Sequence, residues 1–432
     1  MTELEAPGGD TSVKPSEPRA VSRDRARQAR AAASSRARRS SGHAAAGDGT
    51  GRPVVVHRRI WPYALVSLVA LVGLVALAWV GYNASLDVRG GTALNAGTDP
   101  SKPGYEARVK PTPTHLIIPL ASDGRIDDPV LLVEGSKGGG NFVFVPGLTV
   151  VTVEGKPYNL TEVATQLGVP KLVESIQEVL GIAITDAVEL GPEEVTELLG
   201  SAGPLEIENP DPVRVGDEVA FPAGQIELSP GDVPRFLAAF NVGEPVVNRP
   251  FRAQQVWEAW LKKVPSSPPR LAAQTVISGD GTLDITALVT RIAGGAVTAQ
   301  QLPLDRKVVP DMGGFAVYQP NVEAINELMA SVVPFPGSAF PGQRARVRLL
   351  NGTKDPNATL RAARPIVAAG GQVVVIGNAS SFDVASTRVE YNAESQKAAA
   401  QAIAEKLGVA EATPGVESDA ADVTVTIGAD AR

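Results

Sequence analysis

WPYALVSLVALVGLVALAWVGY, at residues 61–82, is a single uncharged and apolar run that divides the chain into two unlike parts. As an α-helix its 22 residues span about 33 Å, against a bilayer hydrocarbon core of about 30 Å. No face of the run is polar, which argues against a core helix of a soluble domain. The sequence therefore predicts a transmembrane helix over 60–82. Aromatic side chains, which favour the membrane interface, lie at both ends: Trp61, Tyr63, Trp79 and Tyr82.

The two flanks of this run differ in charge, which predicts its orientation. Residues 1–59 hold 12 Lys and Arg against 6 Asp and Glu, and the rest of the chain holds 28 against 41. Arg58 and Arg59 directly precede the run. The positive-inside rule then places the N-terminus in the cytoplasm and residues 83–432 outside. The predicted localisation is the cell membrane, with one span and extracellular C-terminal domains.

The alternative interpretation of the run is a cleaved signal peptide, with Asn83-Ala84-Ser85 as the cleavage site. The run is longer than a signal-peptide core and begins 60 residues into the chain, so retention in the membrane is favoured.

Composition excludes several classes of site. The chain has no cysteine, so it forms no disulfide, thiolate metal site or cysteine nucleophile. Of its three histidines only His115 follows the apolar run, which argues against a multi-histidine zinc site and against a Ser-His-Asp triad. His115 is interpreted instead as a residue at the edge of a strand.

The basic tail 1–59 is predicted to be disordered because it is poor in large apolar side chains. Residues 19–39 carry eight arginines and one aspartate. A run of arginines is typical of nucleic-acid binding, but no aromatic side chain lies within this run to stack on a base. The favoured interpretation is that these arginines set the orientation of the membrane helix and also bind anionic lipid headgroups. No nucleic-acid partner is expected.

Residues 83–113 contain four glycines and four prolines and are predicted to be a linker. From residue 114 to about 335, short β-rich runs alternate with amphipathic segments, which predicts a layered α/β domain. The expected strands are 116–120, 129–133, 141–145, 148–153 and 205–208, and the expected helices are 159–166, 171–180, 191–199, 233–240, 252–261, 286–292 and 321–332.

A second Pro/Gly linker at 336–342 precedes a compact set over 343–432. Its elements follow the order β-α-β-β-α-β, which is that of the split βαβ unit. The predicted strands are 346–350, 372–376, 387–391 and 422–427, and the predicted helices are 358–369 and 394–407.

Four motifs in this last segment resemble the LytR C-terminal domain. They are VRLLNGT (347–353), GNASSFD (377–383), STRVEY (386–391) and ADVTVTIGAD (421–430). The resemblance covers about 343–430 and implies a cell-envelope role, but it identifies no catalytic group.

Residues 114–335 resemble, more loosely, the LytR-CpsA-Psr (LCP) domain. The motifs are DGRIDDPVL (123–131), GIAITD (181–186) and RPFRAQQ (249–255). Members of that family transfer a polyprenyl-pyrophosphate-linked glycopolymer to peptidoglycan or another envelope acceptor. The resemblance implies pyrophosphate contacts from Arg125, Arg249 and Arg252, whose planar forks match phosphate oxygens. It also implies Asp127 and Asp123 as ligands of Mg²⁺, which would neutralise charge on the leaving pyrophosphate.

The chain departs from the family pattern at charged positions. Gly147 and Leu148 replace an arginine and an aspartate, and Ala239 and Asn241 replace a later pair of arginines. Three expected pyrophosphate contacts are thereby lost. The favoured interpretation is a non-catalytic, membrane-anchored envelope protein that binds lipid-linked glycan, peptidoglycan or a related LCP enzyme. The alternative is an active glycopolymer phosphotransferase that uses Mg²⁺. A transcriptional attenuator is disfavoured because residues 1–59 show no DNA-reading module.

Overall fold

The computed structural model describes two domains that follow the apolar run. The described residues are 92–93, 99–121, 125–135, 138–239, 241, 248–264, 271, 273–279, 283–308, 316–416 and 420–431. The predicted basic tail and the predicted transmembrane helix lie outside these residues. Among the residues described, no helix has the length and apolar character needed to cross a bilayer.

The C-terminal domain has the predicted β-α-β-β-α-β order. Its elements are β17 (Ala345–Asn351), α10 (Ala358–Ala368), β18 (Gly371–Asn378), β19 (Arg388–Tyr391), α11 (Lys397–Lys406) and β21 (Val423–Ile427), with the short strand β20 (Thr413–Pro414) before β21. The expectation of a split unit is wrong. β17 pairs directly and in parallel with β18, so no strand separates the two strands of the first β-α-β unit.

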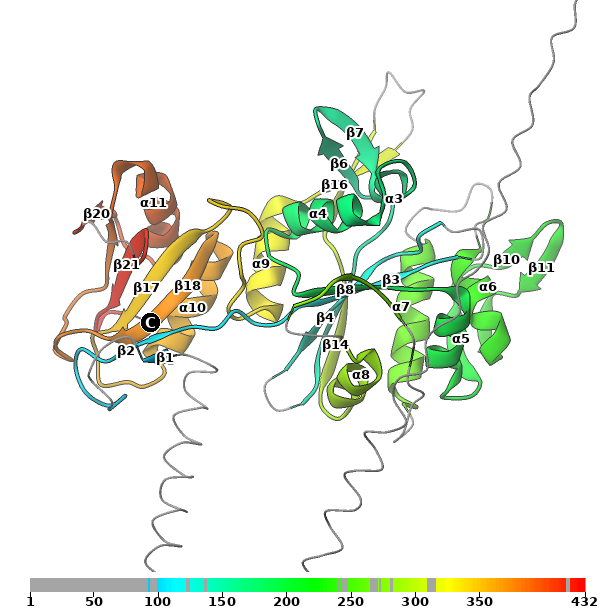
Figure 1. The fold of residues 1–432 in the computed structure, drawn as a ribbon, viewed down its shortest axis with the longest axis horizontal. Helices are drawn as coiled ribbons and strands as arrows, with labels where there is room; N and C mark the ends of the chain where they lie inside the picture. Colours follow the sequence, from blue (N-terminus) through cyan, green and yellow to red (C-terminus); the bar gives the residue numbers. More distant parts are fainter. Residues whose placement is uncertain are drawn as a thin grey trace, which may run out of the picture. The chain divides into compact units, whose positions relative to one another are not determined.

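A strand from the predicted linker completes this sheet. Within 83–113, β1 (Thr92–Ala93) pairs with β2 (Glu106–Arg108), and β2 pairs antiparallel with the edge of β18. The sheet order is β1-β2-β18-β17-β21-β19-β20 (Figure 1). A Cβ on Gly377 would lie 2.2 Å from the carbonyl oxygen of Tyr105, so the close approach of β2 depends on this glycine. Residues 83–113 were predicted to be a linker because of their high Pro and Gly content, so the three-residue strand β2 was not predicted.

The central domain is built on a six-stranded mixed sheet. Its order is β13 (Gln274–Ile277), β8 (Asp186–Leu190), β3 (His115–Pro119), β4 (Val130–Glu134), β5 (Gly140–Phe144) and β14 (Val297–Gln301). β3 is parallel to β8, and β5 is parallel to β14. His115 begins β3, where its Nδ1 lies 2.9 Å from Oδ2 of the buried Asp186. Burial lowers the pKa of His115, and the pair joins two central strands.

Helices cover both faces of this sheet, which gives the predicted α/β/α layers (Figure 1). Successive side chains of a strand point to opposite faces: Leu116 and Ile118 enter one core, and Ile117 enters the other. One face carries α3 (Leu160–Leu167), α4 (Val169–Leu180) and α9 (Val322–Val332). The other carries α5 (Pro192–Gly200), α6 (Val233–Ala238), α7 (Asn248–Leu261) and α8 (Ile285–Ala293). The predicted helices are thus confirmed in place.

In the part of the chain that the structure describes, four antiparallel strand pairs extend from the layers, and most of their strands were not predicted. They are β6 (Val150–Val153) with β7 (Lys156–Asn159), β9 (Leu205–Asn209) with β12 (Gly224–Leu228), β10 (Val213–Val215) with β11 (Glu218–Phe221), and β15 (Leu304–Val308) with β16 (Ala316–Pro320). Only β6 and β9 coincide with expected strands. Helix α7 begins at Asn248, four residues before its predicted start, and this places Arg249 and Arg252 one turn apart.

Candidate functional site

The structure brings Asp127 and Arg249 together although 122 residues separate them. Asp127 follows β3, and its backbone N–H donates to the carbonyl of Pro119 at 2.8 Å. Its Oδ1 accepts a hydrogen bond from Nη2 of Arg249 at 2.7 Å. The same Nη2 lies 3.2 Å from the carbonyl oxygen of Ile126. Helix α7 therefore holds the arginine against the loop that the sequence motif singles out.

Arg252 lies on the next turn of α7 and is buried, with 1% of its surface exposed. Its Nη2 donates to the carbonyl oxygen of Ala239 at 2.6 Å, and its guanidinium lies 5.7 Å from the ring centroid of Phe236. Arg125 is exposed, and Asp123 lies outside the described residues. Of the five predicted site residues, the structure thus pairs Asp127 with Arg249 and places Arg252 beside them.

Burial sets the electrostatics of the acidic pair. It raises the pKa of Asp127 to about 6, against the opposing effect of Arg249, and the neighbouring Asp128 raises it further. Burial also raises the pKa of Asp128, against the effect of Arg249. A carboxyl group that titrates near neutrality is a feature of functional sites as well as of structural ion pairs.

Asp128 is a site residue that the sequence analysis missed. Its Oδ1 accepts a hydrogen bond from the backbone N–H of Gly147 at 2.7 Å. Its Oδ2 is buried, as is Nε of Arg249, and neither atom has a hydrogen-bond partner among the described residues. Buried polar atoms are usually hydrogen-bonded, either to the protein or to ordered water. The available signal was the doubled aspartate before strand β4.

Local packing explains the glycine that replaces the family arginine at position 147. A Cβ there would lie 2.5 Å from Oγ1 of Thr161 and 3.5 Å from Oδ1 of Asp128. The N–H of Thr161, at the start of α3, donates to the carbonyl oxygen of Gly147 at 2.9 Å. The turn that Asp128 caps therefore has no space for a side chain.

Asn241, where the family has an arginine, also has structural partners. Its Oδ1 accepts from the backbone N–H of Arg214 at 2.7 Å, and its Nδ2 donates to the carbonyl oxygen of Pro212 at 2.8 Å. The side chain thus holds β10 in place. Ala239 contributes its carbonyl oxygen to Arg252. Neither position offers positive charge to a ligand.

An apolar pocket of about 380 Å³ lies next to this cluster. Asn248 and Pro250, the chain neighbours of Arg249, both line it. Phe251 also lines it and is 41% exposed. The remaining walls come from the β5–β6 connection, from the last residue of β14 and the residue after it, and from the β15–β16 hairpin: Pro146, Leu148, Gln301, Leu302, Leu304 and Tyr318. Leu148, the second departure from the family pattern, is thus a pocket residue.

The described residues do not fit a preassembled Mg²⁺ site. Mg²⁺ prefers several oxygen ligands in octahedral geometry. Oδ1 of Asp127 is held by a guanidinium, and Oδ1 of Asp128 holds a backbone N–H. Within the described part of the chain, no three acidic or histidine side chains form a group that would hold a metal ion.

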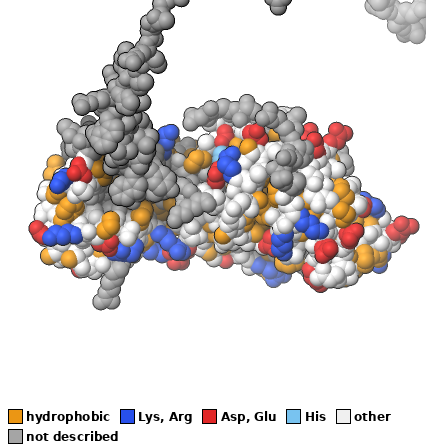
Figure 2. All heavy atoms as spheres, turned by 90° about the horizontal axis from the view of Figure 1, so that it is seen from below, with side chains coloured by type: hydrophobic (Ala, Val, Ile, Leu, Met, Phe, Trp, Pro, Cys, Tyr) orange, Lys and Arg blue, Asp and Glu red, His pale blue; other side chains and the backbone are white. Residues whose placement is uncertain are grey.

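On the face in Figure 2, acidic and basic side chains are interspersed over the described surface, and no continuous basic patch appears on that face.

Residues 344–430 match the family model described as LytR cell envelope-related transcriptional attenuator. The C-terminal domain is a LytR C-terminal domain. The resemblance stated for this segment is thereby confirmed. A search of curated protein sequences finds no match to the chain.

Solved structures similar to this chain cover about half of it. TagV of B. subtilis is 14% identical, over 52% of this chain and 96% of that chain, with a TM-score of 0.42. The LytR-Csp2A-Psr enzyme from Actinomyces oris is 18% identical, over 54% and 97%, with a TM-score of 0.41. A structure of TagT bound to LI-WTA is 16% identical, over 52% and 90%, with a TM-score of 0.41. At these identities and TM-scores, the similarity assigns no activity to the central domain.

Proposed function

We propose that this chain is a single-pass, membrane-anchored cell-envelope protein whose central domain binds a polyprenyl-pyrophosphate-linked glycan without transferring it. The observation that carries the proposal is the apolar pocket of about 380 Å³ whose wall includes both chain neighbours of Arg249. A lipid-linked pyrophosphate needs an apolar surface for its chain and a cation for its head group. The pocket supplies the first and Arg249 the second.

The charge balance of the cluster argues against transfer. Arg249 and Arg252 are offset by the carboxyl groups of Asp127 and Asp128, so the buried cluster has no net positive charge when both are ionised. Catalysis requires contacts that are stronger in the transition state than in the ground state.

The test measures binding of a polyprenyl pyrophosphate in detergent to purified protein and to two variants on one strand. Leu304→Glu places a charge in the pocket, whereas Val308→Glu places one on the exposed end of β15, at a residue that is 52% exposed. Burying an unpaired charge is strongly unfavourable, so Leu304→Glu should weaken binding by roughly tenfold or more, and Val308→Glu should leave it unchanged. Equal affinity in both variants would contradict the proposal.

The second candidate function is the phosphotransferase, and the observation that favours it is the pKa of Asp127 of about 6. A carboxylate whose pKa lies near neutral pH is suited to accept a proton from an attacking hydroxyl. The assay is glycan transfer from a polyprenyl-pyrophosphate donor with Mg²⁺ present. Turnover that disappears in Asp127→Asn would establish the enzyme, and we expect no turnover.

Membrane anchoring and partners belong to the same proposal. The apolar run 61–82 is retained as the anchor, and residues 114–432 lie outside the cell, where peptidoglycan or a related LCP enzyme is within reach. Protease added to intact cells should degrade the region after residue 114. Protection of that region, or recovery of soluble chain outside the cells, would exclude this topology.

A further inference from the structure

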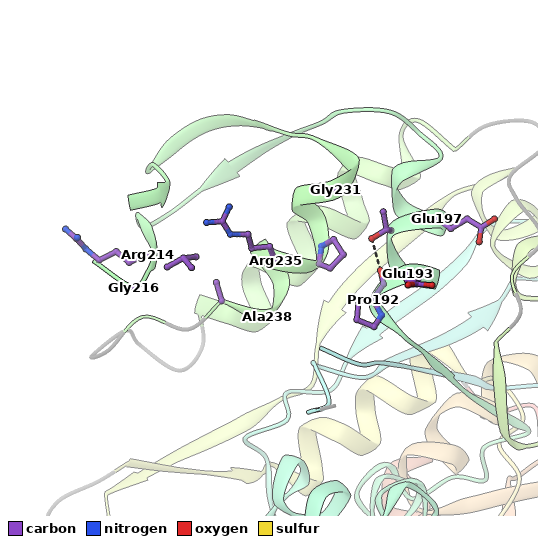
Figure 3. Close-up of a pocket in the computed structure, with 12 residues that line it drawn as sticks. Pro192, Glu193, Glu197, Arg214, Gly216, Gly231, Arg235 and Ala238 are labelled. Atoms are coloured by element: carbon purple, nitrogen blue, oxygen red, sulfur yellow. Dashed lines mark hydrogen bonds between the residues drawn. The ribbon is translucent and has the colours of Figure 1, made fainter. Parts of the chain in front are cut away.

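A second cavity in the central domain, of about 790 Å³, shares no lining residue with the apolar pocket. It lies between the first turns of α5, strand β10 with its turn, and helix α6 (Figure 3). Its volume is within the range of about 300–1,000 Å³ that is typical of small-ligand sites. The function proposed above does not use it.

The ends of this cavity carry opposite charges. In Figure 3, Arg214 and Arg235 lie at one end, and Glu193 and Glu197 at the other. All four residues are exposed, and none of them forms an ion pair with another residue that the structure describes. In Figure 3 the carboxylate of Glu197 points away from the arginines, but no ion pair among the described residues holds it there, so this exposed side chain can turn toward a ligand.

Contacts within the domain position both arginines. Nη1 of Arg214 donates to the carbonyl oxygen of Asp217 at 2.9 Å. The guanidinium of Arg235 lies 5.7 Å from the ring centroid of Phe221, at a distance where a cation and an aromatic face attract each other. Positioned guanidinium groups lose less conformational entropy when they bind a carboxylate.

The surface between the charged ends is small and apolar. Pro192, Val215, Pro234 and Ala238 line it. The cavity has no aromatic lining residue on which a nucleobase would stack. Its two glutamates would repel a polyanion, and its four charged side chains make it a poor site for a lipid chain.

From this arrangement we propose that the cavity binds a short peptide with a free carboxylate and a free ammonium group. The carboxylate lies at the Arg214 and Arg235 end, the ammonium group lies at the Glu193 and Glu197 end, and small aliphatic side chains cover the apolar surface between them. An extended stretch of four residues spans about 13 Å. Charge-assisted hydrogen bonds at both ends then fix the direction of the peptide.

The test uses tetraalanine and its blocked forms with the full-length protein in detergent micelles, followed by ligand-observed NMR titration. Either N-acetylation or C-terminal amidation should weaken binding roughly fivefold, and both together by more than tenfold, because each removes one charge-assisted contact. Equal binding of all four peptides, or binding of none, would overturn the proposal.

Paired variants assign each end of the peptide. Arg214→Gln with Arg235→Gln should weaken tetraalanine roughly fivefold and leave the C-terminal amide unaffected. Glu193→Gln with Glu197→Gln should weaken tetraalanine and leave the N-acetylated form unaffected. The exposed Arg306→Gln and Glu206→Gln, which do not line the cavity, should change neither.

Two further measurements distinguish a peptide site from an anion site and from the apolar pocket. Inorganic pyrophosphate that binds more tightly than tetraalanine, and loses that binding in the arginine variants, would identify an anion site and overturn the peptide proposal. Because the two pockets share no lining residue, Leu304→Glu should leave tetraalanine binding unchanged. Failure of the peptide proposal is therefore distinguishable from failure of lipid-linked glycan binding.

Discussion

Replacing Arg249 by Met should destabilise the protein in a pH-dependent way. Nη2 of Arg249 lies 2.7 Å from Oδ1 of Asp127, and the two side chains are 20% and 11% exposed. Removing one partner of a pair at this depth leaves a buried charge without compensation, which costs about 3 kcal/mol or somewhat more. This destabilisation is relieved only when the carboxyl group of Asp127 takes up a proton.

The pH window follows from the pKa of Asp127, which is about 6 in the folded protein and about 3.9 in an unfolded chain. Because the folded pKa lies above the unfolded one, burial of the carboxylate destabilises the fold above about pH 6. That destabilisation disappears as the pH falls from about 6 toward 4. Without Arg249 the folded pKa rises further, and each added unit lowers stability at alkaline pH by about 1.4 kcal/mol.

The assay is urea unfolding of wild type and Arg249→Met at pH 8 and pH 5. We expect a loss of about 3 kcal/mol at pH 8 and about 1 kcal/mol at pH 5, where Asp127 is protonated and only neutral contacts are lost. Arg249→Lys should retain part of the stability at pH 8. Asp127→Asn in the Arg249→Met background should reduce the difference between the two pH values, and the remainder comes from Asp128, on which Arg249 also acts. An equal loss at pH 5 and pH 8, or a difference that Asp127→Asn leaves unchanged, would refute the proposed pairing.

Three further predictions concern packing. Gly147→Ala should lower the free energy of unfolding by about 1–3 kcal/mol, since its Cβ would meet Oγ1 of Thr161, and Thr161→Ala should recover part of that loss in urea unfolding of the double variant. Arg344 is buried and donates from Nη1 to the carbonyl oxygens of Val367 and Gly371. Its replacement by Met should lower the free energy of unfolding, measured by calorimetry, by about 3 kcal/mol. Replacement by Lys should restore little of that stability because lysine lacks the planar fork. A 343–432 fragment should melt at a lower temperature than the same fragment carrying a tethered 99–113 segment, since β2 covers the edge of β18; identical melting temperatures would show that the strand adds nothing.

Periodicity predicted the helices well because each has one apolar stripe that faces a core. Helix α4 has buried residues at Leu172, Val173, Ile176 and Leu180, which is the spacing of one helical face. The hairpins were mostly missed because their burial is partial. Strand β15 is intermediate at Leu304 and exposed over its other four residues, so it lacks the alternation of buried and exposed positions that indicates a strand.

The candidate site was only partly predictable because its main contact is long-range. The motifs named Asp127 and Arg249 separately, but no local pattern indicates that they pair. Asp128 was overlooked because an aspartate next to another aspartate is usually solvated, whereas this one is buried. The cavity between α5 and α6 depends on a hairpin at 213–221 that the sequence analysis did not identify.

The departures from the family pattern have structural partners, and this bears on how the site is to be interpreted. In sequence, Gly147 and Asn241 are lost arginines. In the structure, Gly147 donates to Asp128 and leaves no space for a side chain, and Asn241 holds β10. Reintroducing an arginine at either position would remove such a contact as well as add charge. A single arginine at either position would therefore not by itself restore a pyrophosphate contact, which is consistent with the binding function proposed above.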